Sequence, residues 1–123
     1  GIPFFFFFYQ DAGPRRGIFV PFCGVLAATY PMLGRFAQMA DAVVIPIHAL
    51  FLPWGRGLEV SFGTPLAGFP TGDVVADATA MNQAIEAMIR TLPAQYFWVH
   101  RRFKTRPPGE PPLYPIRRRW WRR

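Results

Sequence analysis

The sequence predicts an α/β fold in which a mixed sheet is flanked by helices. Short apolar runs rich in aromatic and β-branched residues alternate with segments of helical periodicity, in the order strand, helix, strand, strand, helix, strand. Stretches rich in glycine and proline separate these segments. The length of 123 residues suits a single domain, and no internal repeat interrupts the pattern.

The N-terminal region begins with a predicted buried strand. Residues 2–9 form a continuous apolar run rich in phenylalanine, and the turn-forming residues 11–14 close it. Because the chain starts inside this run, we expect that an upstream portion exists. Residues 18–22 follow as a short strand or an extended loop.

A first helix is expected over residues 30–40. Thr29 is a candidate N-cap, and Pro31 is tolerated in the first helical turn. The spacing of the apolar residues predicts one buried face opposite a polar face. The buried face would hold Met32, Leu33, Phe36 and Met39 or Ala40, and the polar face Arg35 and Gln38.

The middle of the chain predicts a hairpin. Residues 42–50 are rich in β-branched side chains and predict a second buried strand, in which Pro46 limits pairing on one side. A turn over residues 54–57 leads into residues 58–63, where apolar and polar residues alternate as in a half-buried strand. The inward side of that strand would hold Leu58, Val60 and Phe62.

A second helix follows a loop over residues 65–72. The helix begins at Asp73 or Asp77 and ends near Leu92, where Pro93 stops it. Its periodicity predicts one buried face. That face would hold Met81, Ile85, Met88 and Leu92.

Charge is distributed unevenly along the chain, whose formal net charge is +7. Residues 1–98 carry five arginines and six acids, whereas residues 99–123 carry nine arginines or lysines and only Glu110 as an acid. So localised a positive field favours an anionic lipid, a nucleic acid or an acidic protein as the partner. Five prolines within residues 107–115 predict an extended surface segment in this basic end.

Cysteine content and targeting signals add weaker constraints. Cys23 is the only cysteine, which excludes an internal disulfide and favours a reducing compartment. We expect its side chain to be a small buried apolar group. We expect no signal peptide in residues 1–123, and the apolar runs fall short of the ~18 residues that a membrane span needs. Hydrophobic residues make up 51% of the chain, so we expect part of its apolar surface to meet a membrane or another polypeptide.

The most informative stretch is the basic aromatic segment, residues 95–109. It combines four aromatics, a histidine, three arginines and a lysine. Guanidinium and ammonium groups suit phosphate or carboxylate oxygens, and Tyr96, Phe97 and Trp98 can supply an apolar wall. The alternative is a final strand or helix whose aromatics are buried and whose basic rim is solvated.

Four cations of this segment, Arg101, Arg102, Lys104 and Arg106, are the preferred anion-binding set. On a strand, alternation would place Arg102, Lys104 and Arg106 on one face. Arg101 and Phe103 would then lie on the other face. The alternative interpretation is a charge run that is simply solvated.

The same segment resembles the signature of the lipid A biosynthesis acyltransferases, the lauroyl/myristoyl transferase family, within the wider group of lysophospholipid acyltransferase-like proteins. That signature reads P-x-Q-Y-x-W-x-H-R-R-F-K-T-R-P. The matching residues are Pro93, Gln95, Tyr96, Trp98, His100, Arg101, Arg102, Phe103, Lys104, Thr105, Arg106 and Pro107.

The resemblance extends over residues 1–114. Residues 11–29 look like the family's D-x-G, F-V-P-F-F-G and A-A-T elements, and residues 43–46 look like its V-V-P strand with one residue inserted. Residues 69–71 and 77–86 resemble its F-P-T and D-x-x-x-M-N-x-x-I-E elements. We therefore expect residues 1–114 to be the C-terminal part of a single acyltransferase domain of the glycerolipid acyltransferase type.

The resemblance implies transfer of a fatty acyl chain from acyl carrier protein to a hydroxyl of a phosphorylated glycolipid, a lipid A precursor, at the cytoplasmic face of the inner membrane. The family's chemistry uses an H-x4-D/E pair, a general base and its orienting carboxylate, with no metal or cofactor. This chain lacks that pair, because Pro53 follows His48 at the fifth position and Thr105 follows His100. We expect the chain to be inactive alone.

The candidate substrate-binding residues lie near both ends of the chain. Asp11 follows a strand end, the usual site of function in α/β sheets, although turn capping is the alternative. Arg15 and Arg16 would meet a lipid phosphate or else lie on a solvated turn, and His48 suits a core histidine. The predicted set, in which none is assigned a catalytic role, is Asp11, Arg15, Arg16, His100, Arg101, Arg102, Lys104 and Arg106.

The alternative function is a non-enzymatic basic module that binds an anionic membrane or nucleic acid. The near-neutral charge of residues 1–98 argues against nucleic acid, which we do not expect as a partner. The tail, residues 115–123, is rich in arginine and tryptophan and suits the headgroup layer of a membrane surface, or else is a disordered end.

Overall fold

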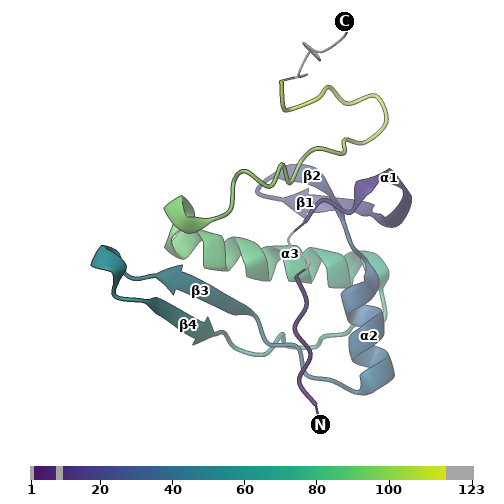
Figure 1. Cartoon of the computed structure of the whole chain (residues 1–123). Coiled ribbons are helices and arrows are strands. Elements are labelled where there is room, and N and C mark those ends of the chain that lie inside the picture. Colours follow the sequence, from purple (N-terminus) through teal and green to yellow (C-terminus); the bar gives the residue numbers. More distant parts are fainter. Residues whose placement is uncertain (1, 8–9, 116–123) are drawn as a thin grey trace, which may run out of the picture.

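A computed structural model describes residues 2–7 and 10–115 and shows a mixed α/β arrangement (Figure 1). The α/β prediction is confirmed at this level, but the single mixed sheet is wrong, since the described strands form two separate antiparallel hairpins. The elements are α1 (Gly13–Arg16), β1 (Ile18–Phe22), β2 (Val25–Thr29), α2 (Met32–Ala40), β3 (Ile47–Phe51), β4 (Leu58–Phe62) and α3 (Val74–Thr91), with short 3-10 turns at Pro53–Gly55 and Pro93–Gln95.

The β1–β2 hairpin forms the centre of the molecule. Its register runs from Ile18 opposite Thr29 to Phe22 opposite Val25. Cys23 and Gly24 make the two-residue turn, and both have positive φ angles, 50° and 77°, as the tight turns of hairpins require. The sequence predicted β1 but missed β2, whose small residues gave no clear strand signal.

Helix α3 packs under this hairpin and is fixed to it by an amide. Asp73 caps the helix by accepting hydrogen bonds from the backbone N–H groups of Val75 and Ala76. The fully buried Asn82 donates its Nδ2 to Pro21 O at 2.8 Å and to Thr29 Oγ1 at 3.1 Å. Of the two predicted starts, Asp73 is the one that the structure shows, and the predicted end near Leu92, before Pro93, is confirmed.

Helix α2 crosses α3 through its smallest residues. Gly34 and Ala37 are the buried residues of α2, and a Cβ atom at Gly34 would lie only 2.9 Å from Asp77 Cβ. The predicted apolar face is therefore wrong, because close backbone approach at Gly34 leaves Met39 exposed and Phe36 partly exposed.

The predicted cap of α2 is also wrong. Pro31 occupies the N-cap position, and no side chain caps the helix start. Thr29 instead ends β2, fully buried, with its hydroxyl donated to Ala27 O. Thr29 is needed inside the core, because Asn82 donates to the same hydroxyl oxygen.

The second hairpin, β3–β4, is confirmed, with Ile47 opposite Phe62 and Phe51 opposite Leu58. The strand predicted over residues 42–50 begins only after Pro46, consistent with the ring's effect on pairing. The burial predicted for residues 42–50 is wrong, since Val43 is 71% exposed. The inward side predicted for residues 58–63 is also wrong, since Leu58, Val60 and Phe62 are all exposed.

The strand predicted over residues 2–9 is not found in the described part of this stretch. Residues 2–7 form no regular element and their phenylalanines are exposed, because no described strand pairs with them. Phe6 stacks on Phe36 of α2, with ring centroids 5.5 Å apart. In the described ranges, no helix is long and apolar enough to cross a membrane.

Candidate functional site

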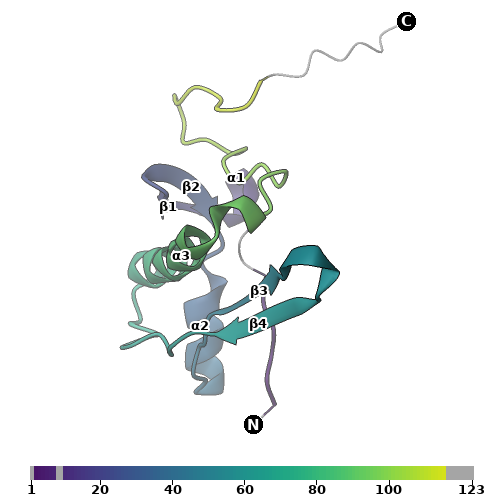
Figure 2. The same ribbon diagram turned by 90° about the vertical axis from the view of Figure 1, so that its left-hand side faces the viewer.

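The basic aromatic segment runs along the β1–β2 hairpin on the side opposite α3, so the hairpin lies between the two (Figures 1 and 2). Residues 96–106 form no strand. The predicted alternation of Arg102, Lys104 and Arg106 on one face is therefore wrong: Arg102 is buried, whereas Lys104 is exposed. The segment follows the backbone of β2 through side-chain hydrogen bonds instead of backbone pairing.

Arg102 makes two of these side-chain contacts and is only 3% exposed. Its Nη1 donates to Ala28 O at 2.7 Å and its Nη2 to Thr29 Oγ1 at 2.6 Å. The guanidinium carbon lies 5.0 Å from the centroid of the Phe22 ring. Burial lowers the pKa of Arg102 below its ordinary value, an effect opposed by Tyr96 and Asp11.

Arg106 makes a similar contact further along β2. Its Nη1 donates to Leu26 O at 2.8 Å, and its Nη2 pairs with Glu110 Oε2 at 3.1 Å. The two arginines thus point at carbonyl oxygens of β2 and not at solvent. Their hydrogen-bonding partners all belong to this chain: two β2 carbonyls, the Thr29 hydroxyl and the Glu110 carboxylate. Binding of an external anion by these two arginines stays a prediction.

Asp11 fixes the other end of the same segment. Its Oδ2 accepts from Thr105 N–H at 2.7 Å, and its Oδ1 accepts from Thr105 Oγ1 and Gly13 N–H, both at 2.8 Å. The carboxylate therefore joins the turn before α1 to the basic aromatic segment. This geometry agrees with the capping alternative for Asp11 and adds a contact that the sequence did not suggest.

Gln95 fixes the β3–β4 hairpin. Its Nε2 donates to Phe51 O at 2.9 Å, while Phe51 N–H donates to Gln95 Oε1 at 2.6 Å. The amide thus pairs with the strand as a neighbouring residue of a sheet would. Sequence reasoning assigned no role to Gln95, Thr105 or Asn82, although each is a specified position of the motifs that carry the resemblance.

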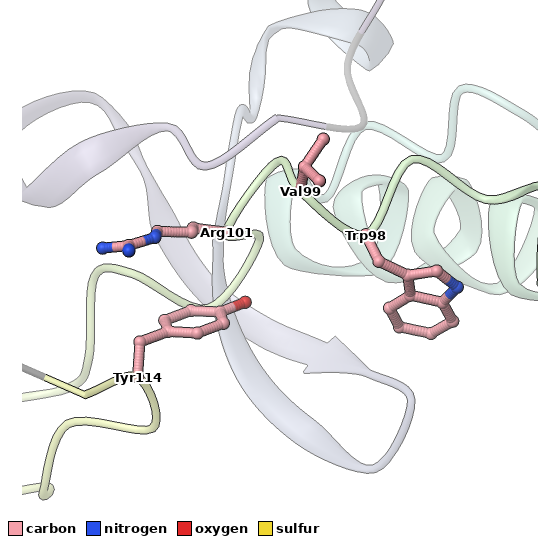
Figure 3. Close-up of a pocket in the computed structure, with 4 residues that line it drawn as sticks. All are labelled: Trp98, Val99, Arg101 and Tyr114. Atoms are coloured by element: carbon pink, nitrogen blue, oxygen red, sulfur yellow. The ribbon is translucent and has the colours of Figure 1, made fainter.

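Beside these contacts lies an open pocket of about 590 Å³, lined by Trp98, Val99, Arg101 and Tyr114 (Figure 3). The Arg101 guanidinium carbon is 5.8 Å from the centroid of the Tyr114 ring. The Nε1 of Trp98 donates to Pro93 O at 2.8 Å, and its ring makes a T-shaped contact with Tyr96, with ring centroids 4.8 Å apart. A cation backed by a ring, next to apolar side chains, suits an anion that carries an apolar group.

The remaining predicted residues divide by exposure. Arg15, Arg16, Arg101 and Lys104 are exposed and free to meet an external anion, whereas His100 is half-buried. The Asp11–Thr105 contact brings the segment that carries Lys104 against the turn that leads into α1. In residues 2–7 and 10–115, no three His, Cys, Asp or Glu side chains are grouped as metal ligands.

Sequence reasoning missed Tyr114 as a pocket residue. It lies beyond the signature in the proline-rich stretch, and its hydroxyl accepts the N–H of Phe103 at 3.2 Å. No local pattern indicates such a return of the chain. The basic tail beyond residue 115 lies outside the described residues.

Fold and site together define a mixed α/β chain whose basic aromatic segment is bound to a central hairpin and leaves a cationic, aromatic-lined pocket open. The chain belongs to the bacterial lipid A biosynthesis acyltransferase family, whose model matches residues 6–105. The recognition of this family from the sequence motifs is confirmed.

Several relatives share this family. The chain is 39% identical over 106 residues to the lipid A biosynthesis lauroyltransferase of Escherichia coli K12. This match covers 85% of the chain and 35% of that protein. It is 32% identical over 114 residues to the myristoyltransferase of the same organism, covering 88% of the chain and 35% of that protein. A lipid A biosynthesis acyltransferase of Haemophilus influenzae is 32% identical over 101 residues, covering 82% and 31%. The chain thus spans about a third of the length of these curated relatives.

Proposed function

We propose that the chain is the C-terminal, acceptor-binding portion of an acyltransferase that moves a fatty acyl group from acyl carrier protein to a hydroxyl of a phosphorylated lipid A precursor. The family match over residues 6–105, which includes most of the signature, carries this proposal. The enzyme would work at the cytoplasmic face of the inner membrane, with a partial glycerolipid acyltransferase-like fold in these residues.

The reaction needs a base that takes the proton of the acceptor hydroxyl while its oxygen attacks the acyl carbonyl, and the thiol of the carrier protein leaves. Neither histidine of the chain is followed by an acid at the fifth position. His48 lies in β3 and His100 is half-buried within the basic aromatic segment. We therefore place the reacting pair in a part of the enzyme outside these 123 residues.

Arg101 and Lys104 would bind the phosphate of the acceptor. Both are exposed, and Arg101 lines the pocket in which Trp98 and Val99 offer apolar contact. Guanidinium and ammonium groups make strong charge-assisted hydrogen bonds to phosphate oxygens. Arg102 and Arg106 support this surface from behind, because they hold the segment on β2.

The first test concerns activity. The 123-residue chain, assayed with acyl carrier protein loaded with a fatty acid and a phosphorylated lipid A precursor, should give no acylated product. Turnover by the chain alone would contradict the placement of the reacting pair.

The second test uses an acyltransferase that contains this segment together with an H-x4-D/E pair. Arg101→Glu and Lys104→Glu should each raise KM for the phosphorylated acceptor about tenfold or more, since each loses a charge-assisted contact. The matched control is Arg35→Glu on the exposed side of α2, which should leave KM unchanged. Equal kinetics for all three variants would support the alternative of a solvated charge run.

A further inference from the structure

One side of the β3–β4 hairpin is entirely apolar and exposed or half-exposed. Because side chains alternate along a strand, one side of the ladder carries only apolar residues, while the other carries His48, Leu50, Glu59 and Ser61. No charge lies on the apolar side. Its residues are Ile47, Ala49, Phe51, Leu58, Val60 and Phe62.

The turn of this hairpin presents a tryptophan and an arginine to the outside. Trp54 is 96% exposed, the largest exposure among the described large apolar side chains, and its φ angle is +59°. A positive φ is uncommon for a bulky residue, and such backbone outliers are often found at functional sites. Arg56 is exposed two residues later, and the turn over residues 52–57 contains no acid.

The hairpin turn lies next to the beginning of the basic aromatic segment. The two hydrogen bonds between Gln95 and Phe51 join them, and both views place the turn beside the 3-10 turn Pro93–Gln95 (Figures 1 and 2). Phe97 and Trp98 follow at once and are 61% and 55% exposed. Exposed apolar side chains therefore continue from the hairpin turn to the pocket that contains Arg101.

We propose that the β3–β4 turn inserts into the interface of an anionic lipid bilayer, with Trp54 at the acyl boundary and Arg56 at the lipid phosphates. Tryptophan and arginine are the side chains that favour this layer, and the cations at the turn and at the pocket complement its negative charge. The inference rests on the proposed function for its membrane-bound acceptor, and it orients the pocket toward the lipid surface.

A bilayer fits this surface better than a second protein chain does. The exposed apolar residues are not confined to the flat side of the hairpin, because they continue around the turn to Trp54 and across to Phe97. A continuous apolar surface of this kind, next to arginines, suits a deformable lipid layer bordered by phosphates. A second copy of the chain remains an outcome that the experiment detects.

The experiment measures the depth of Trp54 directly. In the 123-residue chain, Trp98→Phe, Trp120→Phe and Trp121→Phe leave Trp54 as the only tryptophan. Vesicles of about 70% phosphatidylcholine and 30% phosphatidylglycerol, with and without brominated acyl chains, are then titrated. We expect a blue shift of Trp54 emission and quenching by the brominated lipid. A chain that binds these vesicles without quenching overturns the proposal.

Two variants of the otherwise native chain complete the test. Trp54→Asn, a residue that tolerates positive φ, should weaken binding to the same vesicles about tenfold, and circular dichroism should be unchanged. Met39→Asn, at a 76% exposed apolar site on α2, is the matched control and should have no effect. Equal binding of the two variants, or a chain dimer that Trp54→Asn dissociates in sedimentation, overturns the proposal.

Failure of this inference is distinguishable from failure of the proposed function. Vesicle binding requires no acyl transfer, so quenching of Trp54 in a family member that proves inactive leaves the inference standing. Conversely, Trp54→Asn in an active acyltransferase should retain turnover of a detergent-dispersed acceptor, even where it lowers turnover on vesicles.

Discussion

At the scale of single residues, the cations of the basic aromatic segment fall into two groups, one buried and one exposed, with different roles. Arg102 and Arg106 donate to the carbonyls of β2, whereas Arg101 and Lys104 remain exposed. Burial of a guanidinium is costly unless hydrogen bonds offset it, and loss of the Arg102 guanidinium would leave Ala28 O and Thr29 Oγ1 without that donor. Loss of activity on mutation therefore has two distinct causes within one six-residue stretch.

Arg102→Lys tests the structural role. Lysine keeps the charge but cannot place two donors on Ala28 O and Thr29 Oγ1 in the planar arrangement of arginine. We expect the free energy of unfolding, measured by urea titration, to fall by about 2 to 4 kcal/mol. The control Arg101→Lys should change it by less than about 0.5 kcal/mol, because Arg101 is exposed. Equal stability of the two variants would contradict the bracing role of Arg102.

The sequence predicted the chemistry of these cations, but not which of them are buried against β2 and which remain exposed. Arg101 and Arg102 are adjacent and identical in type, so local pattern cannot tell which one turns toward β2. The difference comes from packing of the segment against Phe22 and Thr29, which lie more than seventy residues earlier in the chain. Tyr114 was missed for the same reason, since only the return of the chain brings it to the pocket.

At the scale of elements, three polar side chains take over the role that backbone pairing has in a larger sheet. Gln95 pairs with β3, Arg102 with the end of β2, and Asn82 joins α3 to β1 and β2. These contacts position two small hairpins that share no strand-to-strand hydrogen bonds in the described residues. The relative placement of the hairpin turn and the pocket therefore depends on Gln95.

Gln95→Leu should free the end of the β3–β4 hairpin without unfolding the protein. Leucine offers neither donor nor acceptor to Phe51, so both exposed hydrogen bonds are lost, and each contributes about 1 kcal/mol or less. We expect the amide of Phe51 to exchange with deuterium roughly tenfold faster, as followed by NMR. Gln83→Leu on the exposed side of α3 is the matched control. Unchanged exchange at Phe51 would show that other contacts hold the hairpin.

Elements with strong local signals were predicted well. Helix α3 has an aspartate cap and a proline stop, and the β3–β4 hairpin has alternating residues around a glycine-rich turn. Residues 2–7 show the opposite case, because an apolar run becomes a strand only when a neighbour offers backbone partners. The packing side of α2 was likewise decided by Asp77 of another helix, which meets Gly34.

At the scale of the whole molecule, the described core is small and lies on one side. The buried apolar residues all belong to the region around β1, β2, α2 and α3, and none lies within residues 42–72. Burial of apolar surface is the main source of stability, so the two halves of the structure should differ in their resistance to opening.

Hydrogen exchange of the whole chain, followed by mass spectrometry, measures this difference. Peptides from β1, β2 and the middle of α3 should be protected at least about tenfold more than peptides from β3 and β4. Addition of anionic vesicles should reduce this difference in protection, because it should slow exchange in the β3–β4 turn. Uniform protection in the absence of vesicles would mean that the chain opens as one cooperative unit.

The distance along the chain between Thr29 and its partner has a consequence for synthesis. Arg102 follows Thr29 by 73 residues, and at about 5 to 20 residues per second a ribosome needs roughly 4 to 15 seconds to make them. During that interval the nascent β1–β2 hairpin lacks the two hydrogen bonds that Arg102 donates to Ala28 O and Thr29 Oγ1. The central hairpin is therefore translated well before the segment that completes its contacts.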